Sequence, residues 1–226
     1  MTETGGLAQG RGHAWPFVRD REHRESCGWA RQGWRGQRGA VIVEAALVLP
    51  VILTLILGVM EFGFIWKDDL ALANATRSAA RVGAAAGKDQ YADYNILQQI
   101  KSGTNALPNG VIQQVIVWEA NTTTTPPTAC KNVVGSGGVA QLGPPAVYCN
   151  VYTGNDVATL ATGSFINSCL SGPDHFWCPS SRLNTQAGPP DYVGVYIKIN
   201  HQYVTKILGT SRTLSDSSIM RVEPVG

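Results

Sequence analysis

The chain has 226 residues and a formal net charge of only +2, which suits one medium-sized domain with appended segments. Most of the basic excess lies in residues 1–39, with seven arginines and four acids, whereas residues 67–226 carry eleven Lys plus Arg against ten acids. The nearly neutral C-terminal part argues against binding of nucleic acid, which needs a concentrated basic face.

The first 66 residues indicate a membrane anchor. Residues 1–39 are rich in Gly, Arg and polar residues without apolar periodicity, and we expect a flexible basic cytoplasmic leader there. Residues 40–66 are almost entirely apolar and long enough to cross a bilayer as a helix. Arginines precede this run and "KDD" follows it, so the positive-inside rule places the N-terminus in the cytoplasm and the remainder outside.

A cleaved secretory signal is the alternative interpretation of the apolar run. The sequence "ALA" at residues 71–73 resembles a small-residue cleavage site. However, the apolar core of a signal peptide has about 7–15 residues, and this run is longer. We therefore predict a single-pass protein of the cytoplasmic membrane, in contact with membrane lipid.

Residues 67–103 are predicted to be helical. The segment up to Gly87 is dense in Ala and Leu, so we expect the membrane helix to continue through it and to stop at that glycine. A second short helix is expected over 91–103. The small residues of the first segment fit two interpretations, close approach to helices of other chains or packing of the helix on its own domain.

Residues 104–226 are predicted to form a β-rich domain. Apolar and β-branched residues indicate strands within 111–120, 146–152, 191–204 and 212–224. In the third of these, apolar residues alternate with others from Val193 to Ile199, which is typical of a half-buried strand. The predicted fold class is therefore α+β, with one long N-terminal transmembrane helix, a small antiparallel sheet and disulfide-stapled loops.

Four of the five cysteines lie after the apolar run, on the predicted outer side, at positions 130, 149, 169 and 178. Disulfides persist outside the cytoplasm, and four cysteines allow three pairings. Proximity in the sequence favours Cys130–Cys149 and Cys169–Cys178. Zinc bound by Cys169, His175 and Cys178 is an alternative, but an oxidising compartment favours the disulfide.

The sequence contains no catalytic motif on which an enzyme could be argued. Neither His175 nor His201 lies in an H-E-x-x-H motif, and there is no nucleophile elbow or phosphate-binding loop. We therefore predict a protein that is not an enzyme, with no catalytic residues, no cofactor and no metal.

The most informative residue is Glu44, a carboxylate five residues inside the apolar run. Such a charge is costly in hydrocarbon and is a functional candidate by default. If the chain is cut between Gly39 and Ala40, Glu44 becomes the fifth residue of the mature protein. The alternative is that Glu44 reaches the inner interface, since it lies only about 9 Å along a helix from Arg38. Pro50 is a candidate helix break, because proline removes a backbone hydrogen bond.

This arrangement resembles the signal of type IV prepilins, and more specifically the TadE-like family of the tight-adherence pilus. Over the apolar run, the matching residues are Arg38, Gly39, Val43, Glu44, Ala46, Leu47, Pro50, Gly58, Glu61 and Gly63. Further matches are Asn74, Ala75, Ala79, Ala80, Arg81 and Gly83, and the final "IMRVEP" at 219–224 resembles family tails. The resemblance is strong over residues 38–87 and absent from the leader and the cysteine-bearing loops.

The resemblance implies a structural minor pilin or pseudopilin of a tight-adherence pilus or a related secretion apparatus. It implies cleavage after Gly39 by a prepilin peptidase, and partners among other pilin subunits and the inner-membrane assembly platform. Glu44 would then face the amine of Ala40 in a neighbouring subunit. The alternative function is a signal-anchored extracytoplasmic binding module, in which the motif around Glu44 is accidental.

Overall fold

The computed structural model describes residues 37–105, 107, 112–142, 146–166, 168–184, 188–206 and 209–223. The predicted leader therefore lies almost wholly outside the described residues. The chain divides into two compact units, Met1–Leu47 and Val48–Gly226, and each is described by itself. The first contributes only the start of one helix to the described residues, and the second contains the sheet.

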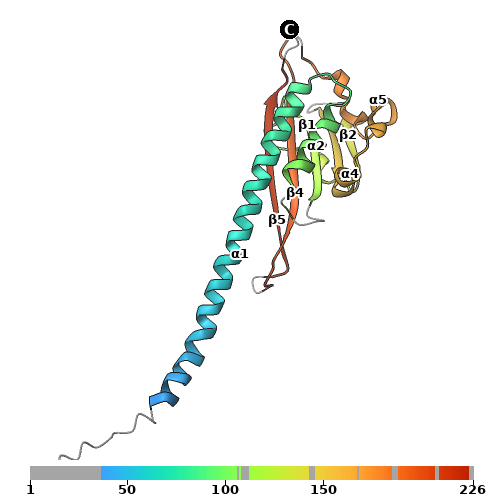
Figure 1. The fold of residues 1–226 in the computed structure, drawn as a ribbon. Coiled ribbons are helices and arrows are strands. Elements are labelled where there is room, and N and C mark those ends of the chain that lie inside the picture. The colour runs from blue at the N-terminus through green and yellow to red at the C-terminus, as the bar shows by residue number, and fades with distance from the viewer. Residues whose placement is uncertain are drawn as a thin grey trace, which may run out of the picture. The chain divides into compact units, whose positions relative to one another are not determined.

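The long N-terminal helix, α1 (Gln37–Ala86), passes from the first unit into the second (Figure 1). It contains Pro50 and is helical on both sides of it, so the structure shows no interruption of the helix at this proline. The hydroxyl of Thr54 donates a hydrogen bond of 2.8 Å to the Pro50 carbonyl. The helix ends before Gly87, whose φ of 56° is the left-handed conformation that favours glycine. This end agrees with the stop that the sequence predicts.

The described residues of the second unit form a five-stranded antiparallel sheet with the order β2-β3-β1-β4-β5. The strands are β1 (Ile112–Glu119), β2 (Gly137–Gln141), β3 (Val147–Thr153), β4 (Tyr192–Gln202) and β5 (Ser211–Arg221). Four of them lie where the sequence predicts strands. The fifth, β2, lies between the predicted strand segments 111–120 and 146–152, where the sequence analysis predicts no strand, so the predicted sheet lacked one strand.

Short helices occupy the connections. They are α2 (Ala92–Gly103), α3 (Thr128–Lys131), α4 (Gly154–Ala158), α5 (Ser168–Ser171), and the 3-10 turns η1 (Thr162–Phe165), η2 (His175–Trp177) and η3 (Pro179–Ser181). Disulfides join Cys130 to Cys149 and Cys169 to Cys178, which is the pairing that their proximity in the sequence favours. The predicted α+β class is confirmed, with one long apolar N-terminal helix, an antiparallel sheet and two disulfides among the described residues.

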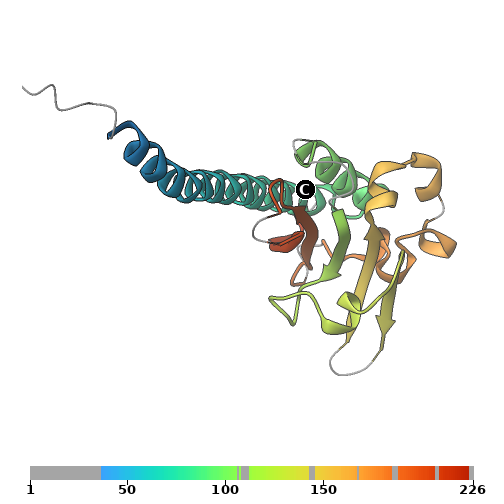
Figure 2. The ribbon, with the colours of Figure 1, turned by 90° about the horizontal axis from the view of Figure 1, so that it is seen from below.

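The main core lies between the sheet and the helices α1 and α2, which cover the same face (Figures 1 and 2). The alternating residues of β4 predicted to be buried, Val193 to Ile199, all point into this core and are fully buried. The small residues of α1 that enter it are Ala75, Ala79 and Ala80. Their burial favours the second interpretation of these small residues, packing on the helix's own domain.

A smaller core covers the opposite face of the sheet and contains the disulfide Cys130–Cys149. Trp118 lies fully buried in it, paired with Gly194 on β4. A Cβ atom on Gly194 would lie 2.3 Å from the indole ring of Trp118. This glycine therefore makes room for the largest side chain of the smaller core.

Candidate functional site

The C-terminal part of the apolar run, residues 48–60 of α1, is exposed around almost the whole helix. Only Leu57 and Gly58 are half-buried in this stretch. A helix that is apolar on all sides and has no protein around it is typical of a membrane span. Among the described residues, α1 is the one helix that is long and apolar enough to cross a membrane.

The residues of the predicted cleavage and assembly site lie in the first turns of α1. Gly39, Ala40 and Glu44 are exposed, and a Cβ atom on Gly39 would have no other atom within 4 Å. Within the described part of the chain, Glu44 makes no hydrogen bond or ion pair. The structure therefore leaves this carboxylate accessible and does not bring it together with another predicted site residue.

A second carboxylate of α1, that of Glu61, is used inside the chain. Its side chain is 1% exposed. Its Oε1 atom accepts a hydrogen bond of 2.7 Å from the backbone N–H of Val204, and Oε2 accepts one of 3.4 Å from that of Thr205. These amides belong to the turn between β4 and β5. Glu61 thus fixes the tip of the β4–β5 hairpin to the helix.

A third carboxylate, that of Asp68, binds the same hairpin two helical turns further on. The Nδ1 atom of His201 lies 2.6 Å from Oδ2 of Asp68, and both side chains are buried. Because a carboxylate accepts hydrogen bonds, Nδ1 is the donor of this pair. Glu61, Ile65, Asp68 and Leu72 follow the spacing of three and four residues that places side chains on one face of a helix, and that face is buried against the domain.

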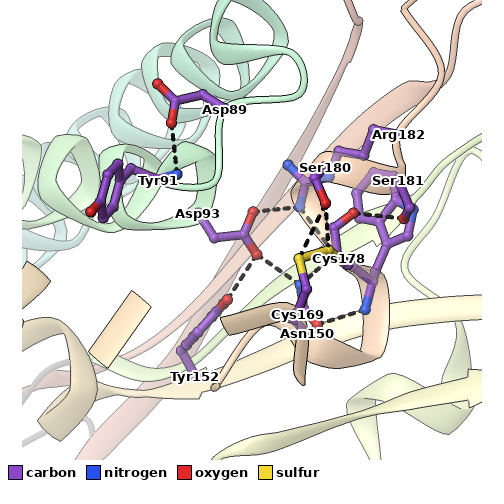
Figure 3. Close-up of polar contacts among 11 residues, drawn as sticks. Asp89, Tyr91, Asp93, Asn150, Tyr152, Cys169, Cys178, Ser180, Ser181 and Arg182 are labelled. Atoms are coloured by element: carbon purple, nitrogen blue, oxygen red, sulfur yellow. Dashed lines mark hydrogen bonds and ion pairs between the residues drawn. A yellow bond between two sulfur atoms is a disulfide. The ribbon is translucent and has the colours of Figure 1, made fainter. Parts of the chain in front are cut away.

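A buried polar network connects α2, β3 and the segment around the second disulfide (Figure 3). Asp93 on α2 pairs with Nη2 of Arg182 at 2.5 Å. Its Oδ2 atom accepts hydrogen bonds from Nδ2 of Asn150 at 2.8 Å and from the hydroxyl of Tyr152 at 2.7 Å. All four side chains are fully buried, which is the arrangement that makes a buried charge tolerable.

The same network holds the segment 175–182 through Trp177. Asn150 donates to the carbonyl of Trp177 at 3.0 Å and accepts from its N–H at 2.9 Å. The guanidinium of Arg182 stacks over the Trp177 ring, 4.1 Å from its centroid. Burial, followed by the charge of Asp93, raises the pKa of Tyr152 well above its usual value, so its hydroxyl remains a donor. Because these groups are sealed from solvent, we interpret the network as structural.

A cavity of about 440 Å³ lies beside this segment. It is lined by aromatic residues, including Tyr148 and His175, and by the carboxylates of Glu119 and Asp191. Burial, and then the charge of Asp191, raises the pKa of Glu119 above its usual value. No cluster of three or more possible metal ligands occurs among the described residues, and Cys169 and Cys178, the thiols of the zinc alternative, are joined in a disulfide.

Comparison with known proteins bears on the helix rather than on the cavity. Residues 39–81 match the family model of the TadE-like proteins. The resemblance that the sequence indicates is confirmed over this segment, and the TadE-like family is associated with the tight-adherence pilus. No curated protein and no solved structure matches the chain.

The segment that matches the TadE-like model contains both the exposed carboxylate and the two buried carboxylates of α1. It begins at Gly39, includes Glu44, Glu61 and Asp68, and ends at Arg81 within α1. The sheet, the disulfides and the cavity lie outside it. Glu44 is predictable as a site from the sequence. The partners of Glu61 and Asp68 are not, since these partners lie on a hairpin more than 130 residues further along the chain.

Proposed function

We propose that the chain is a membrane-anchored minor pilin or pseudopilin of a tight-adherence pilus or a related secretion apparatus. Residues 40–66 anchor it, the N-terminus is cytoplasmic and the disulfide-bonded domain is extracytoplasmic. The match over residues 39–81 supports the link to the pilus. The long exposed apolar helix supports the anchor.

The observation that carries the proposal is the contrast between the acids of α1. Glu61 and Asp68 are buried, and groups of the same chain bind their carboxylates. Glu44 also lies in the apolar run but has no such partner within the described residues. A carboxylate without a partner in a membrane helix is costly, by up to about 2.5–3.5 kcal/mol at the helix centre on insertion scales. A partner from another molecule would offset this cost.

The mechanism supplies that partner by proteolysis. A prepilin peptidase cleaves the bond after Gly39 and leaves a cationic amine on Ala40, four residues from Glu44. In the fibre, Glu44 of one subunit pairs with the amine of a neighbouring pilin. This pairing compensates the charge of Glu44 and fixes the axial register between the two subunits. The inner-membrane assembly platform transfers the cleaved subunit from the membrane to the fibre.

The cleavage step is tested by sequencing the N-terminus of the protein recovered from membranes, with and without the peptidase. We expect Ala40 as the first residue only when the peptidase is present. Gly39→Leu should block cleavage, whereas Gly63→Leu is a matched control, because a side chain at either position enters open space. A chain that keeps its leader in the presence of the peptidase would refute this step.

The assembly step is tested with Glu44→Ala, compared with Asp69→Ala, which removes an exposed acid of the same helix beyond the apolar run. We expect the first variant to be cleaved and inserted but absent from sheared pili, and the second to behave as the wild type. Normal piliation by Glu44→Ala would refute the role of Glu44. A photo-crosslinker on the apolar part of α1 that captures lipid but no pilin would instead favour a signal-anchored binding module.

A further inference from the structure

The turn of the β4–β5 hairpin lies beside the end of the apolar run. Glu61 is the first charged residue after the run Ala40–Met60, and its carboxylate binds the backbone of Val204 and Thr205. β4 and β5 run alongside α1 in Figure 1, within the second unit. We use "hairpin tip" for residues 203–206 and 209–210, which close the turn through a hydrogen bond from Tyr203 N–H to the carbonyl of Thr210.

Two placements of the membrane boundary both bring this tip into contact with the bilayer. If the hydrocarbon ends at Met60, the residue that binds the tip is the first one in the interfacial layer. If the span continues to Trp66, Glu61 lies about 7.5 Å deeper, at 1.5 Å per residue, and the tip lies below the surface. Leu57 and Gly58, one helical turn before Glu61, are also half-buried, whereas the other residues of 48–60 are exposed.

The exposed chemistry of the tip suits a lipid surface. Val204 is 70% exposed and Lys206 is exposed, while Tyr203 is half-buried against His201, with ring centroids 5.6 Å apart. Residues 202–213 include Lys206 and Arg212 but no acid. Aromatic rings favour the interface, and lysine keeps its charge among headgroups while its stem lies on apolar groups. Cationic residues also favour anionic phosphates.

The helix α1 also exposes side chains that favour a membrane interface, and these lie beside the residue that binds the hairpin tip. Phe62 and Trp66 are exposed, with ring centroids 6.4 Å apart, and they lie next to Glu61 and Ile65, which are buried against the domain. An aromatic pair on the helix and an apolar, cationic hairpin tip therefore occur at one level of the second unit. A surface that carries this combination at the end of a membrane span fits a phospholipid headgroup layer.

We propose that the hairpin tip is a second membrane contact, which rests among the phosphate headgroups at the C-terminal end of the α1 span. A helix alone leaves the rotation and tilt of an attached domain to its neighbours, whereas interfacial anchors fix them. With Glu61 holding the tip to the helix, the two contacts set one orientation of the domain on the bilayer. The proposal rests on the membrane anchor and is independent of cleavage and pilus assembly.

The experiment measures the environment of the tip in the full chain. Cys27→Ser removes the cysteine outside the two disulfides, and Val204→Cys then provides one site for an environment-sensitive fluorophore. Val134→Cys is the matched control, because Val134 is 97% exposed and lies just before β2, the strand at the opposite edge of the sheet from β5. The purified chain is reconstituted in phosphatidylcholine–phosphatidylglycerol vesicles that contain a lipid with a nitroxide on its headgroup.

We expect emission at shorter wavelength and strong quenching by the nitroxide lipid for the label at 204, and neither effect for the label at 134. Thr210→Cys, an exposed position across the turn, gives the same readout if a label at 204 disturbs the hairpin. Labels at 204 and 210 that are as open to an aqueous quencher as the label at 134 would overturn the proposal.

A second copy of the chain is the competing occupant of the tip. Reconstitution over a range of lipid-to-protein ratios separates the two, because a lipid contact persists on dilution and a contact between copies is lost. Protection that disappears at high lipid would therefore refute the lipid contact. Neither result depends on the peptidase or on other pilins, so failure here leaves the proposed function standing.

Discussion

Removal of the Asp93 carboxylate is the sharpest test of how the second unit is held together. In the structure this group pairs with Arg182 and accepts hydrogen bonds from Asn150 and Tyr152, and all four side chains are fully buried. Asp93→Ala leaves the guanidinium without this partner in a site closed to water. The change therefore removes a charge pair and two hydrogen bonds at one position.

The expected loss follows from the burial of Arg182. Breaking a buried ion pair by removal of one partner costs about 3–5 kcal/mol, since the remaining charge is uncompensated. The free energy of unfolding of a domain is typically about 5–15 kcal/mol, so the variant should lose a large part of its stability. Asp174 is buried near Tyr152, whose pKa it helps to raise, so a second carboxylate remains close to this network in the variant. We therefore expect a value near the lower end, about 3 kcal/mol.

The assay is urea unfolding of the detergent-solubilised full chain with its disulfides intact, followed by tryptophan fluorescence. Trp177, which stacks on Arg182, reports directly on this region. Asp69→Ala is the control and should change the free energy of unfolding by less than about 0.5 kcal/mol, as exposed substitutions do. The double variant Asp93→Leu/Arg182→Met removes both charges and should be more stable than Asp93→Ala. A loss below about 1 kcal/mol for Asp93→Ala, or a double variant no more stable than Asp93→Ala, would contradict the reasoning.

Three further changes test other parts of the domain with the same unfolding assay. Burial, and then a neighbouring carboxylate, raises the pKa of Glu119 above 4.5, so its ionised form opposes folding at neutral pH; Glu119→Gln should stabilise at pH 7, with a gain that disappears as the pH falls below 4.5. Replacing both Cys130 and Cys149 by Ala opens a loop with a sequence separation of 19 and should cost about 3 kcal/mol; an unchanged midpoint would be inconsistent with the disulfide. Gly194→Ala places a methyl group 2.3 Å from the ring of Trp118 and should cost at least about 1–3 kcal/mol, which a wild-type midpoint would disprove.

The strands that the sequence predicts correctly are rich in apolar and β-branched residues, and one of them, β4, also shows a period of two. In β4, four apolar residues from Val193 to Ile199 point into the main core, and the pattern alone indicates both the strand and its buried face. β2 carries no such pattern. Its Gly138 lies so close to β3 and Phe176 that a Cβ atom would come 2.2 Å from the carbonyl oxygen of Cys149. Glycine at this position allows β2 to pair with β3 under Phe176, and this requirement is visible only in the tertiary structure.

The polar contacts of α1 were predictable in position but not in partner. Glu61, Ile65, Asp68 and Leu72 share one helix face, so the spacing places both acids on the side that packs against the domain. In the sequence, however, Glu61 only interrupts an apolar run and Asp68 only belongs to the charged "KDD" at its end. Their partners lie 143 and 133 residues away. Local periodicity carries no information on contacts over such separations.

On the proposed function, the carboxylates at the two ends of the apolar run differ in whether they need a new partner when the chain leaves the bilayer. At the C-terminal end, Glu61 is bound by its own hairpin, and this partner travels with the domain because both belong to the second unit. At the N-terminal end, the described residues offer Glu44 no partner. On the proposed function, transfer into a fibre then requires one new polar contact for these two carboxylates, at Glu44. Because that contact forms only between subunits, it stabilises the correct register in the fibre and does not stabilise the isolated chain.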